Sequence, residues 1–167
     1  MTLSQIAVLI PLHFAVTVGD LDESDAAFGE TPRHEALAAE VVRLTRESDM
    51  VERVVVESFD HLAIGAIKRS YSRIRTAALF EPQLTHPIST IRRLRMVDAA
   101  LAVAADEVAL HHTLAAERVI EKARQAGLEV VVWTVEDPSW IRRARALDIK
   151  ALISNDPGLM VRQRNEA

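Results

Sequence analysis

Hydrophobic and polar residues follow two patterns that alternate along the chain. Short runs of β-branched and other apolar residues are typical of buried strands, and the segments between them carry apolar residues at the spacing of an amphipathic helix. The runs predict strands at residues 13–18, 53–58, 74–79, 107–111, 129–135 and 150–154. The helical spacing predicts helices at residues 34–48, 61–70, within 89–105, at 114–126, from 138 and from 157.

Several of these helices have recognisable ends. Asp60 precedes the helix at 61–70 and is a good N-cap, because its carboxylate can accept the first free backbone N–H groups. The Asp-Pro pairs at 137–138 and 156–157 also predict helix starts. Proline has no backbone N–H, and at the first position of a helix that N–H would have no partner within the helix anyway. Gly127 follows the helix at 114–126, where glycine suits a left-handed backbone.

The order of the elements predicts the fold class. Strands separated by helices favour right-handed crossovers and a parallel sheet, and continuous apolar strands favour a sheet covered on both faces. No glycine-rich phosphate loop follows a predicted strand, so a Rossmann or P-loop fold has no support. An α/β barrel and a flavodoxin-like open sheet remain. Six strand–helix units favour a partial TIM barrel, because a complete TIM barrel has eight such units.

Composition narrows the classes of protein. The 167 residues fit one domain, and the net charge of −4 argues against a nucleic-acid partner, whose phosphates need cationic residues. The absence of cysteine excludes disulfides and thiolate metal sites. The apolar segment 6–18 contains Pro11 and His13, is shorter than the ~20 residues of a membrane span, and lacks the basic flank of a signal peptide. We therefore expect a cytoplasmic protein with no membrane span.

Three segments carry a resemblance to a known family. They are "RVVVESFD" at 53–60, "AGLEVVVWTVEDP" at 126–138 and "SNDP" at 154–157. Their order and spacing resemble the glycerophosphodiester phosphodiesterase family over roughly residues 2–160. The resemblance implies a TIM barrel. The chain, 1–167, would then be a single truncated domain with barrel strands three to eight, and residues 2–11 would resemble the helix entry before the third strand.

The resemblance also implies a chemistry. Members hydrolyse glycerophosphodiesters to an alcohol and glycerol 3-phosphate in phospholipid metabolism, usually with a divalent metal, Mg or Ca, at the carboxyl ends of the strands. An aromatic residue of the family lies beside the substrate glycerol at the position of Trp133. Strand alternation places Val131, Trp133 and Val135 on one face, which we expect to face the barrel axis. Ser58 and His111 are the other candidates for contact with a glycerophosphodiester ligand.

The catalytic motifs of the family are not matched. Its first strand carries His-Arg-Gly, its second a metal-binding Glu-x-Asp pair and its third Glu-x-Lys. The chain has no His-Arg-Gly, and we expect no Glu-x-Asp pair either. Thr17 and Gly19 stand where the third-strand glutamate and lysine would be. We therefore expect no catalytic residue, no metal and no other cofactor in this chain, and an inactive isolated protein.

Structural explanations stand beside the functional ones. Trp133 could be a core indole whose N–H bonds to backbone, and the sequence names no histidine that would activate Ser58 for nucleophilic work. His111 and His112 are adjacent on a strand, so we expect them to point to opposite faces and to share no metal ion, with an ordinary surface role as the alternative. His34 belongs to no ligand spacing, which predicts a structural role.

The missing barrel strands predict open edges. Strands 13–18 and 150–154 should each have one unpaired side, unless they bend to pair with each other. We expect Val54 to face inward with Trp133, and Glu57 to face outward. A C-shaped sheet with an exposed apolar inner face would follow. Such a face favours self-association or a complementing chain.

Three alternatives to a normal enzyme remain open. The chain could be a degenerate, non-catalytic domain that binds a phosphodiester or a protein partner. It could be half of a split enzyme that another chain completes. It could also be a gene fragment.

Overall fold

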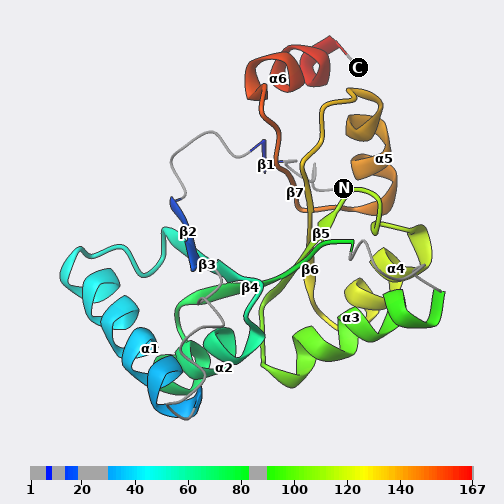
Figure 1. Cartoon of the computed structure of the whole chain (residues 1–167). Coiled ribbons are helices and arrows are strands. Elements are labelled where there is room, and N and C mark those ends of the chain that lie inside the picture. Colours follow the sequence, from blue (N-terminus) through cyan, green and yellow to red (C-terminus); the bar gives the residue numbers. More distant parts are fainter. Residues whose placement is uncertain (1–6, 9–13, 19–29, 83–89, 167) are drawn as a thin grey trace.

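The computed structural model describes residues 7–8, 14–18, 30–82 and 90–166 (Figure 1). Within these residues, seven strands form one sheet, and every strand pair in it is parallel. The strands are β1 (Ala7–Val8), β2 (Phe14–Val18), β3 (Val54–Ser58), β4 (Arg75–Phe80), β5 (Glu107–His111), β6 (Glu129–Trp133) and β7 (Ala151–Leu152). The helices are α1 (Glu30–Glu47), α2 (His61–Ser70), α3 (Thr90–Ala102), α4 (Glu117–Gln125), α5 (Ser139–Leu147) and α6 (Pro157–Glu166).

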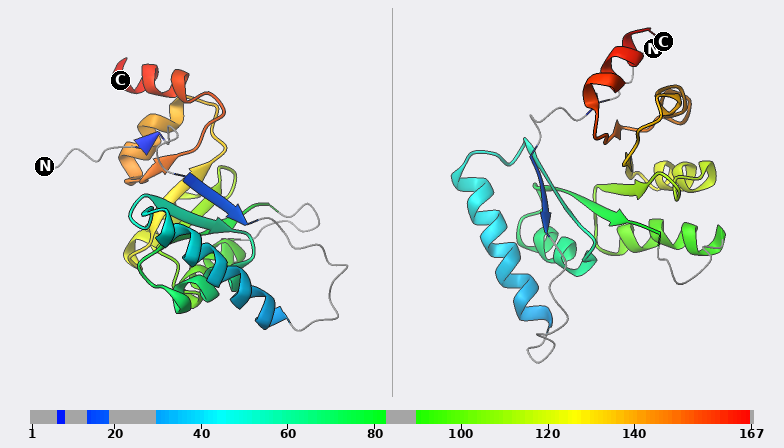
Figure 2. Two further views of the ribbon diagram at one scale, coloured as in Figure 1. Left: turned by 90° about the vertical axis from the view of Figure 1, so that its left-hand side faces the viewer. Right: turned by 45° about the horizontal axis from the view of Figure 1, so that its top comes forward.

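The sheet is curved and open. Its strand order is β1-β7-β6-β5-β4-β3-β2, and the described residues show no pairing of β1 with β2. The helices lie along the convex side of this arc (Figures 1 and 2). We call the helix-covered side the outer face and the opposite side the inner face. None of the helices in the described ranges is long and apolar enough to span a bilayer.

The short strand β1 was not predicted. It pairs with β7 through Ala7–Ala151 and Val8–Leu152, so the expectation of six strands with an unpaired side on strand 150–154 is wrong. The physical reason is that the free edge of β7 offers N–H and C=O groups, which a short apolar segment can satisfy. The expected helix entry at 2–11 is contradicted at these two residues, and its other residues lie outside the described ones. At the other end, β2 pairs only with β3 within the described residues.

Packing against the helices shows which residues of β3 lie on the outer face. Val54 and Val56 are buried in one cluster with Ala38 of α1 and Ile67 of α2. The prediction that Val54 faces inward is therefore wrong. Alternation along β3 places Val55 and Glu57 on the inner face, which also corrects the prediction that Glu57 points outward.

The inner face is better covered than expected. Its buried members are Ala77, Leu79, Ala109, Val131 and Ala151, and Val55, Phe59, Trp133 and Ile153 pack against them while partly exposed. The prediction of an exposed apolar inner face is wrong for the buried five. Three of these five are alanines, which present little side-chain area, and larger neighbours contact them.

The helix ends follow the local chemistry that predicted them. Asp60 Oδ1 accepts the N–H groups of Leu62 and Ala63 at the start of α2. The carboxylates of Asp137 and Asp156 each accept a backbone N–H at the start of α5 and α6. Gly127, with φ of +81°, follows α4. These predictions are confirmed, although α4 begins at 117 rather than 114.

Candidate ligand site at the carboxyl ends of the strands

Trp133 is the last residue of β6 and lies partly exposed at the carboxyl end of the sheet. Its indole N–H donates to the carbonyl of Ala109, with an N–O distance of 3.2 Å. Its ring meets the rings of Phe59 and His111 edge to face, with centroids 5.8 and 5.2 Å away. The indole N–H is therefore satisfied by backbone, as in the structural explanation, while the ring still forms part of the surface at this end.

Val135 does not share the face of Trp133. It is buried with Val130 and Val132 in a second cluster on the outer face, whereas Val131 and Trp133 belong to the inner face. The strand ends at Trp133, so the alternation that predicted an inward Val135 stops two residues earlier. The predicted inward pair of Val131 and Trp133 is confirmed.

His111 ends β5 and is in register with Trp133. The hydroxyl of Thr113 lies 2.9 Å from its Nδ1, and the Thr113 N–H also donates to Nδ1 at 3.4 Å. A ring nitrogen that accepts an N–H carries no proton, so we assign the neutral ring's proton to Nε2. Burial lowers the pKa of His111, and the charge of His112 acts in the same direction against a raising effect of Glu81. His111 is therefore biased toward a neutral ring that donates from Nε2.

His112 lies beside His111 rather than on the opposite face. The two ring centroids are 4.2 Å apart, which contradicts the prediction that the rings point apart. The reason is that β5 ends at His111, so strand alternation no longer fixes the direction of the next side chain, although the N–H of His112 still donates to the carbonyl of Trp133 of the neighbouring strand at 2.6 Å. The buried Nδ1 of His112 has no hydrogen-bond partner among the described residues.

Ser58 is placed away from this surface. It is completely buried, and its hydroxyl accepts the N–H of Asp60 at 3.0 Å in the turn between β3 and α2. It belongs to the outer-facing series of Val54 and Val56. Ser58 therefore builds the turn, and the structure gives it no surface at which a ligand could be contacted.

Two residues of this region were not predicted as site residues. Phe59 lies on the inner face against Trp133, and Glu57 occupies the inner-face position two residues before it. The sequence signal for both residues was the alternation of β3, which continues one residue past the end of the strand. Because Val54 was predicted to face inward, this alternation placed Glu57 and Phe59 on the wrong face. We call Phe59, His111 and Trp133 the aromatic cluster.

The metal of the family has no fitting set of ligands here. Mg or Ca ions take about six or more oxygen ligands, usually with several carboxylates among them. Among the described residues no group of three or more His, Asp or Glu side chains could hold a metal ion. Thr17 pairs in register with Glu57, and Gly19 lies outside the described residues. The residues that the structure describes therefore do not fit the metal.

The expectation that Glu-x-Asp is absent needs correction. The triplet occurs at 23–25, outside the described residues, and at 47–49. The second copy lies at the end of α1, where Glu47 pairs with Arg43 at 2.5 Å and Asp49 has a left-handed φ of 53°. A chain leaving α1 toward the start of β3 is at the amino ends of the strands. This copy therefore lies at the wrong end of the sheet for the family's metal pair.

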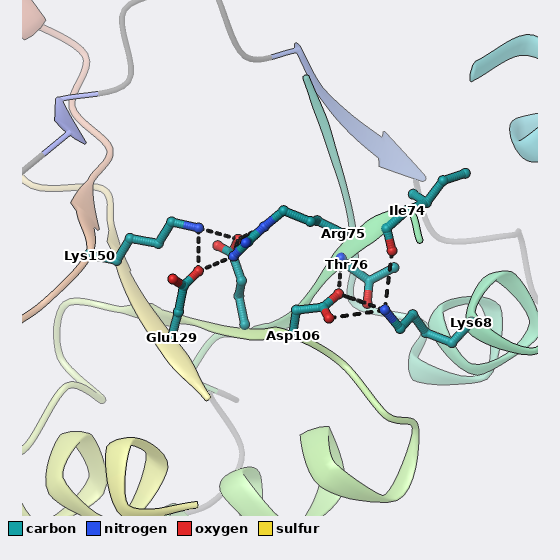
Figure 3. Close-up of polar contacts among 8 residues, drawn as sticks. Lys68, Ile74, Arg75, Thr76, Asp106, Glu129 and Lys150 are labelled. Carbon is teal, nitrogen blue, oxygen red and sulfur yellow. Dashed lines mark hydrogen bonds and ion pairs between the residues drawn. The ribbon is translucent and has the colours of Figure 1, made fainter. Parts of the chain in front are cut away.

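The amino end of the inner face carries a different kind of site. Arg75, Glu107, Glu129 and Lys150, from the starts of β4, β5 and β6 and from just before β7, form an ionic network that we call the amino-end network (Figure 3). The Glu107 side chain is 3% exposed and lies 2.9 Å from Arg75 and 2.7 Å from Lys150. Burial acts to lower the pKa of Arg75, but its bond to Glu107 and both carboxylate charges outweigh burial, so this pKa is raised.

A second ionic contact adjoins this network. Lys68 of α2 reaches both carboxylate oxygens of Asp106 at 2.9 and 3.0 Å and also donates to the carbonyl of Ile74 (Figure 3). Asp106 in turn accepts the backbone N–H of Thr76 at 2.7 Å. Every charged group in this contact has an opposite or polar partner. The sequence signal for both contacts was a charged residue at the start of otherwise apolar strands.

Comparisons with known proteins agree with the arrangement of the chain. A profile of the glycerophosphoryl diester phosphodiesterase family matches residues 13–159. The chain is 25% identical over 146 residues to glycerophosphodiester phosphodiesterase GDPD4 of Arabidopsis thaliana, a match that covers 85% of this chain and 42% of that protein.

Solved structures show the same fold. A Silicibacter pomeroyi DSS-3 protein, assigned as a glycerophosphoryl diester phosphodiesterase, superposes with a TM-score of 0.71 at 20% identity, covering 92% of this chain and 50% of that one. An Oleispira antarctica phosphodiesterase in complex with the product sn-glycerol-3-phosphate gives 0.60 at 14% identity, covering 80% and 51%. The chain thus spans about half the length of these structures.

The class that the fold defines is an α/β protein with the architecture of a partial TIM barrel, as predicted. Within that class, the chain belongs to the glycerophosphoryl diester phosphodiesterase family, which confirms the resemblance found in the sequence.

Proposed function

We propose that this chain binds glycerophosphodiesters or glycerol 3-phosphate at the carboxyl ends of its strands and does not hydrolyse them by itself. The observation that carries the proposal is the aromatic cluster, in which Phe59, His111 and Trp133 converge from three strands or strand ends on the inner face. In α/β barrels, ligands are bound at this end of the sheet.

The cluster offers two kinds of contact. The partly exposed rings of Trp133 and Phe59 provide an apolar surface for the C–H groups of glycerol. The Nε2–H of neutral His111 provides a donor for a phosphate oxygen or a hydroxyl. The bound sn-glycerol-3-phosphate of the Oleispira antarctica neighbour supports this class of ligand. Thr17 at the glutamate position, and the lack of a fitting set of metal ligands among the described residues, support binding without hydrolysis.

Fluorescence of Trp133 tests the binding. The chain has two tryptophans, so Trp140→Phe leaves Trp133 as the sole reporter. Titration with sn-glycerol 3-phosphate should change its emission saturably, and inorganic phosphate should bind more weakly because it lacks the glycerol. His111→Gln in the same background should weaken both titrations. Emission that does not respond to either compound at millimolar concentration would exclude the site.

Hydrolysis is tested separately. With glycerophosphocholine and Mg or Ca, we expect no glycerol 3-phosphate above the level given by a Trp133→Ala variant. Metal-dependent release above that control would show that the isolated chain is active. The binding result is independent of this assay, because binding is measured without turnover.

A second candidate function is that of one half of a split enzyme. The observation that favours it is β2, which pairs only with β3 within the described residues and so leaves an edge for a further parallel strand. The partner would be a chain that carries the His-Arg-Gly and Glu-x-Asp strands of the family. Co-expression with such a segment from a full-length relative should restore hydrolysis. The oligomeric state of the chain alone, measured by sedimentation, shows whether a second copy of the chain pairs with the free side of β2 instead.

A further inference from the structure

The turn between β3 and α2 is held at both of its ends. The N–H of Asp60 donates to Oγ of Ser58 at 3.0 Å, and Ser58 itself is completely buried. Asp60 Oδ1 then accepts the N–H groups of Leu62 at 2.9 Å and of Ala63 at 3.4 Å, which caps α2. Phe59 is the residue between these two anchors, so its backbone has little freedom.

The cap uses only one oxygen of Asp60. The other, Oδ2, lies 2.6 Å from Nε2 of His34, which belongs to α1 and is 26 residues earlier in the sequence. The side chains are 9% and 24% exposed, so this contact is largely shielded from water. Since a serine or threonine could cap the helix without it, the second oxygen has a role beyond capping.

The held residue is also a member of the aromatic cluster. The ring of Phe59 lies edge to face against Trp133, with an interplanar angle of 74° and a centroid distance of 5.8 Å. A change in the backbone of Phe59 would therefore move one wall of the cluster. The chain of contacts runs from His34 through Asp60 and Phe59 to Trp133.

We propose that His34 is a positioning residue for the aromatic cluster. By fixing the carboxylate of Asp60 it fixes the turn, and with it the angle at which Phe59 packs on Trp133. The inference concerns the free protein and goes beyond ligand binding. Its test needs no ligand, so it can fail while the proposed binding function stands, and the reverse also holds.

The test measures how acrylamide quenches Trp133 in the Trp140→Phe background. His34→Leu removes the donor while keeping an apolar volume on α1, and should raise the quenching constant and shift the emission to the red. His34→Gln can still donate to Asp60 and should restore both values toward those of the parent. The matched control is Thr45→Val, which removes another buried polar group of α1 whose hydroxyl donates to the carbonyl of Val41 at 2.7 Å. It should leave Trp133 unchanged.

A second variant approaches the same contact from its other side. Asp60→Ser keeps a hydroxyl for the cap but removes the oxygen that meets His34, so it should reproduce the change seen in His34→Leu even if that variant folds poorly. Combining the two should add no further change, because both remove one contact. A purely structural role for His34 would lower the unfolding free energy without altering Trp133 in the folded baseline. Unchanged quenching in His34→Leu and Asp60→Ser, or equal effects of Gln and Leu at position 34, would overturn the proposal.

Discussion

The two ends of the inner face are built on opposite principles. At the amino end, Arg75, Glu107 and Lys150 satisfy one another, and the central carboxylate is almost completely buried. At the carboxyl end, the aromatic cluster is partly exposed, and the neutral ring of His111 offers an Nε2–H donor at its edge. At the amino end the charged groups are paired within the protein, and at the carboxyl end the rings are partly exposed to solvent.

This difference separates stability from binding. When a buried carboxylate has two cationic partners, removing the carboxylate or a partner lowers the stability of the fold, because the remaining charges are left unpaired. Replacing a partly exposed ring lowers the free energy of unfolding by less. Such rings are also the groups that a ligand can cover. In α/β barrels, the amino ends of the strands usually serve stability and the carboxyl ends serve function. The following predictions test whether this chain keeps that division.

The largest expected effect is at Glu107. Glu107→Ala should lower the free energy of unfolding by about 2–4 kcal/mol, since it leaves Arg75 and Lys150 without their buried partner. Both cations are more than 30% exposed and can turn toward water, which keeps the loss below that of a fully buried pair. Urea unfolding followed by circular dichroism measures the change.

Glu129→Ala is the matched control for this prediction. Glu129 contacts the same two cations but is 45% exposed, so its loss should cost less than about 1 kcal/mol. Equal losses in the two variants would mean that burial of Glu107 does not set the stability of the amino end.

An intermediate effect is expected at Asp60, which serves both stability and the carboxyl end. Asp60→Ala removes the cap of α2 and should cost about 1–2 kcal/mol. Asp60→Ser keeps a capping oxygen and should recover most of that stability. If Asp60→Ser is as unstable as Asp60→Ala, the contact with His34 would be a main source of stability, and the division between the two ends would be less sharp.

A smaller stability effect is expected at Trp133. Trp133→Leu should cost about 1 kcal/mol, because the ring is only partly buried and its N–H meets a backbone carbonyl that water can also reach once the ring is gone. Binding of sn-glycerol 3-phosphate, measured by calorimetry, should nevertheless be lost. A large loss of stability with binding retained would assign Trp133 to the core instead.

Local chemistry was the part of the fold that the sequence could predict. Asp60 and Gly127 were assigned because a cap depends on a few neighbouring residues. The orientation of Val54 was not, because β3 is apolar on both faces and its alternation is hidden. Strand β1 has only two residues and gives no periodic signal.

The site shows the same limit. Trp133 was predicted from a strand end and a family motif, and the structure places it at the expected end. The contact of His34 with Asp60 joins residues 26 positions apart, and the amino-end network requires the register of four strands. Such contacts depend on tertiary packing, which no local pattern of this sequence specifies.

The smallest expected effect is the pH dependence contributed by His111. Its pKa is lowered in the folded chain, chiefly by burial and then by His112, so the unfolded chain binds a proton more readily. Its contribution to stability is therefore fully present above the unfolded pKa of about 6.5 and is lost as the pH falls below that value toward the folded pKa. His111→Gln cannot titrate, so its urea midpoint should fall less than that of the parent between pH 8 and pH 5. The other histidines are present in both proteins, so the difference between the two profiles reports on position 111 and its contact with His112. Parallel profiles would mean that the ring is as well solvated in the folded chain as in the unfolded one, and that the carboxyl end is more open than its aromatic contacts indicate.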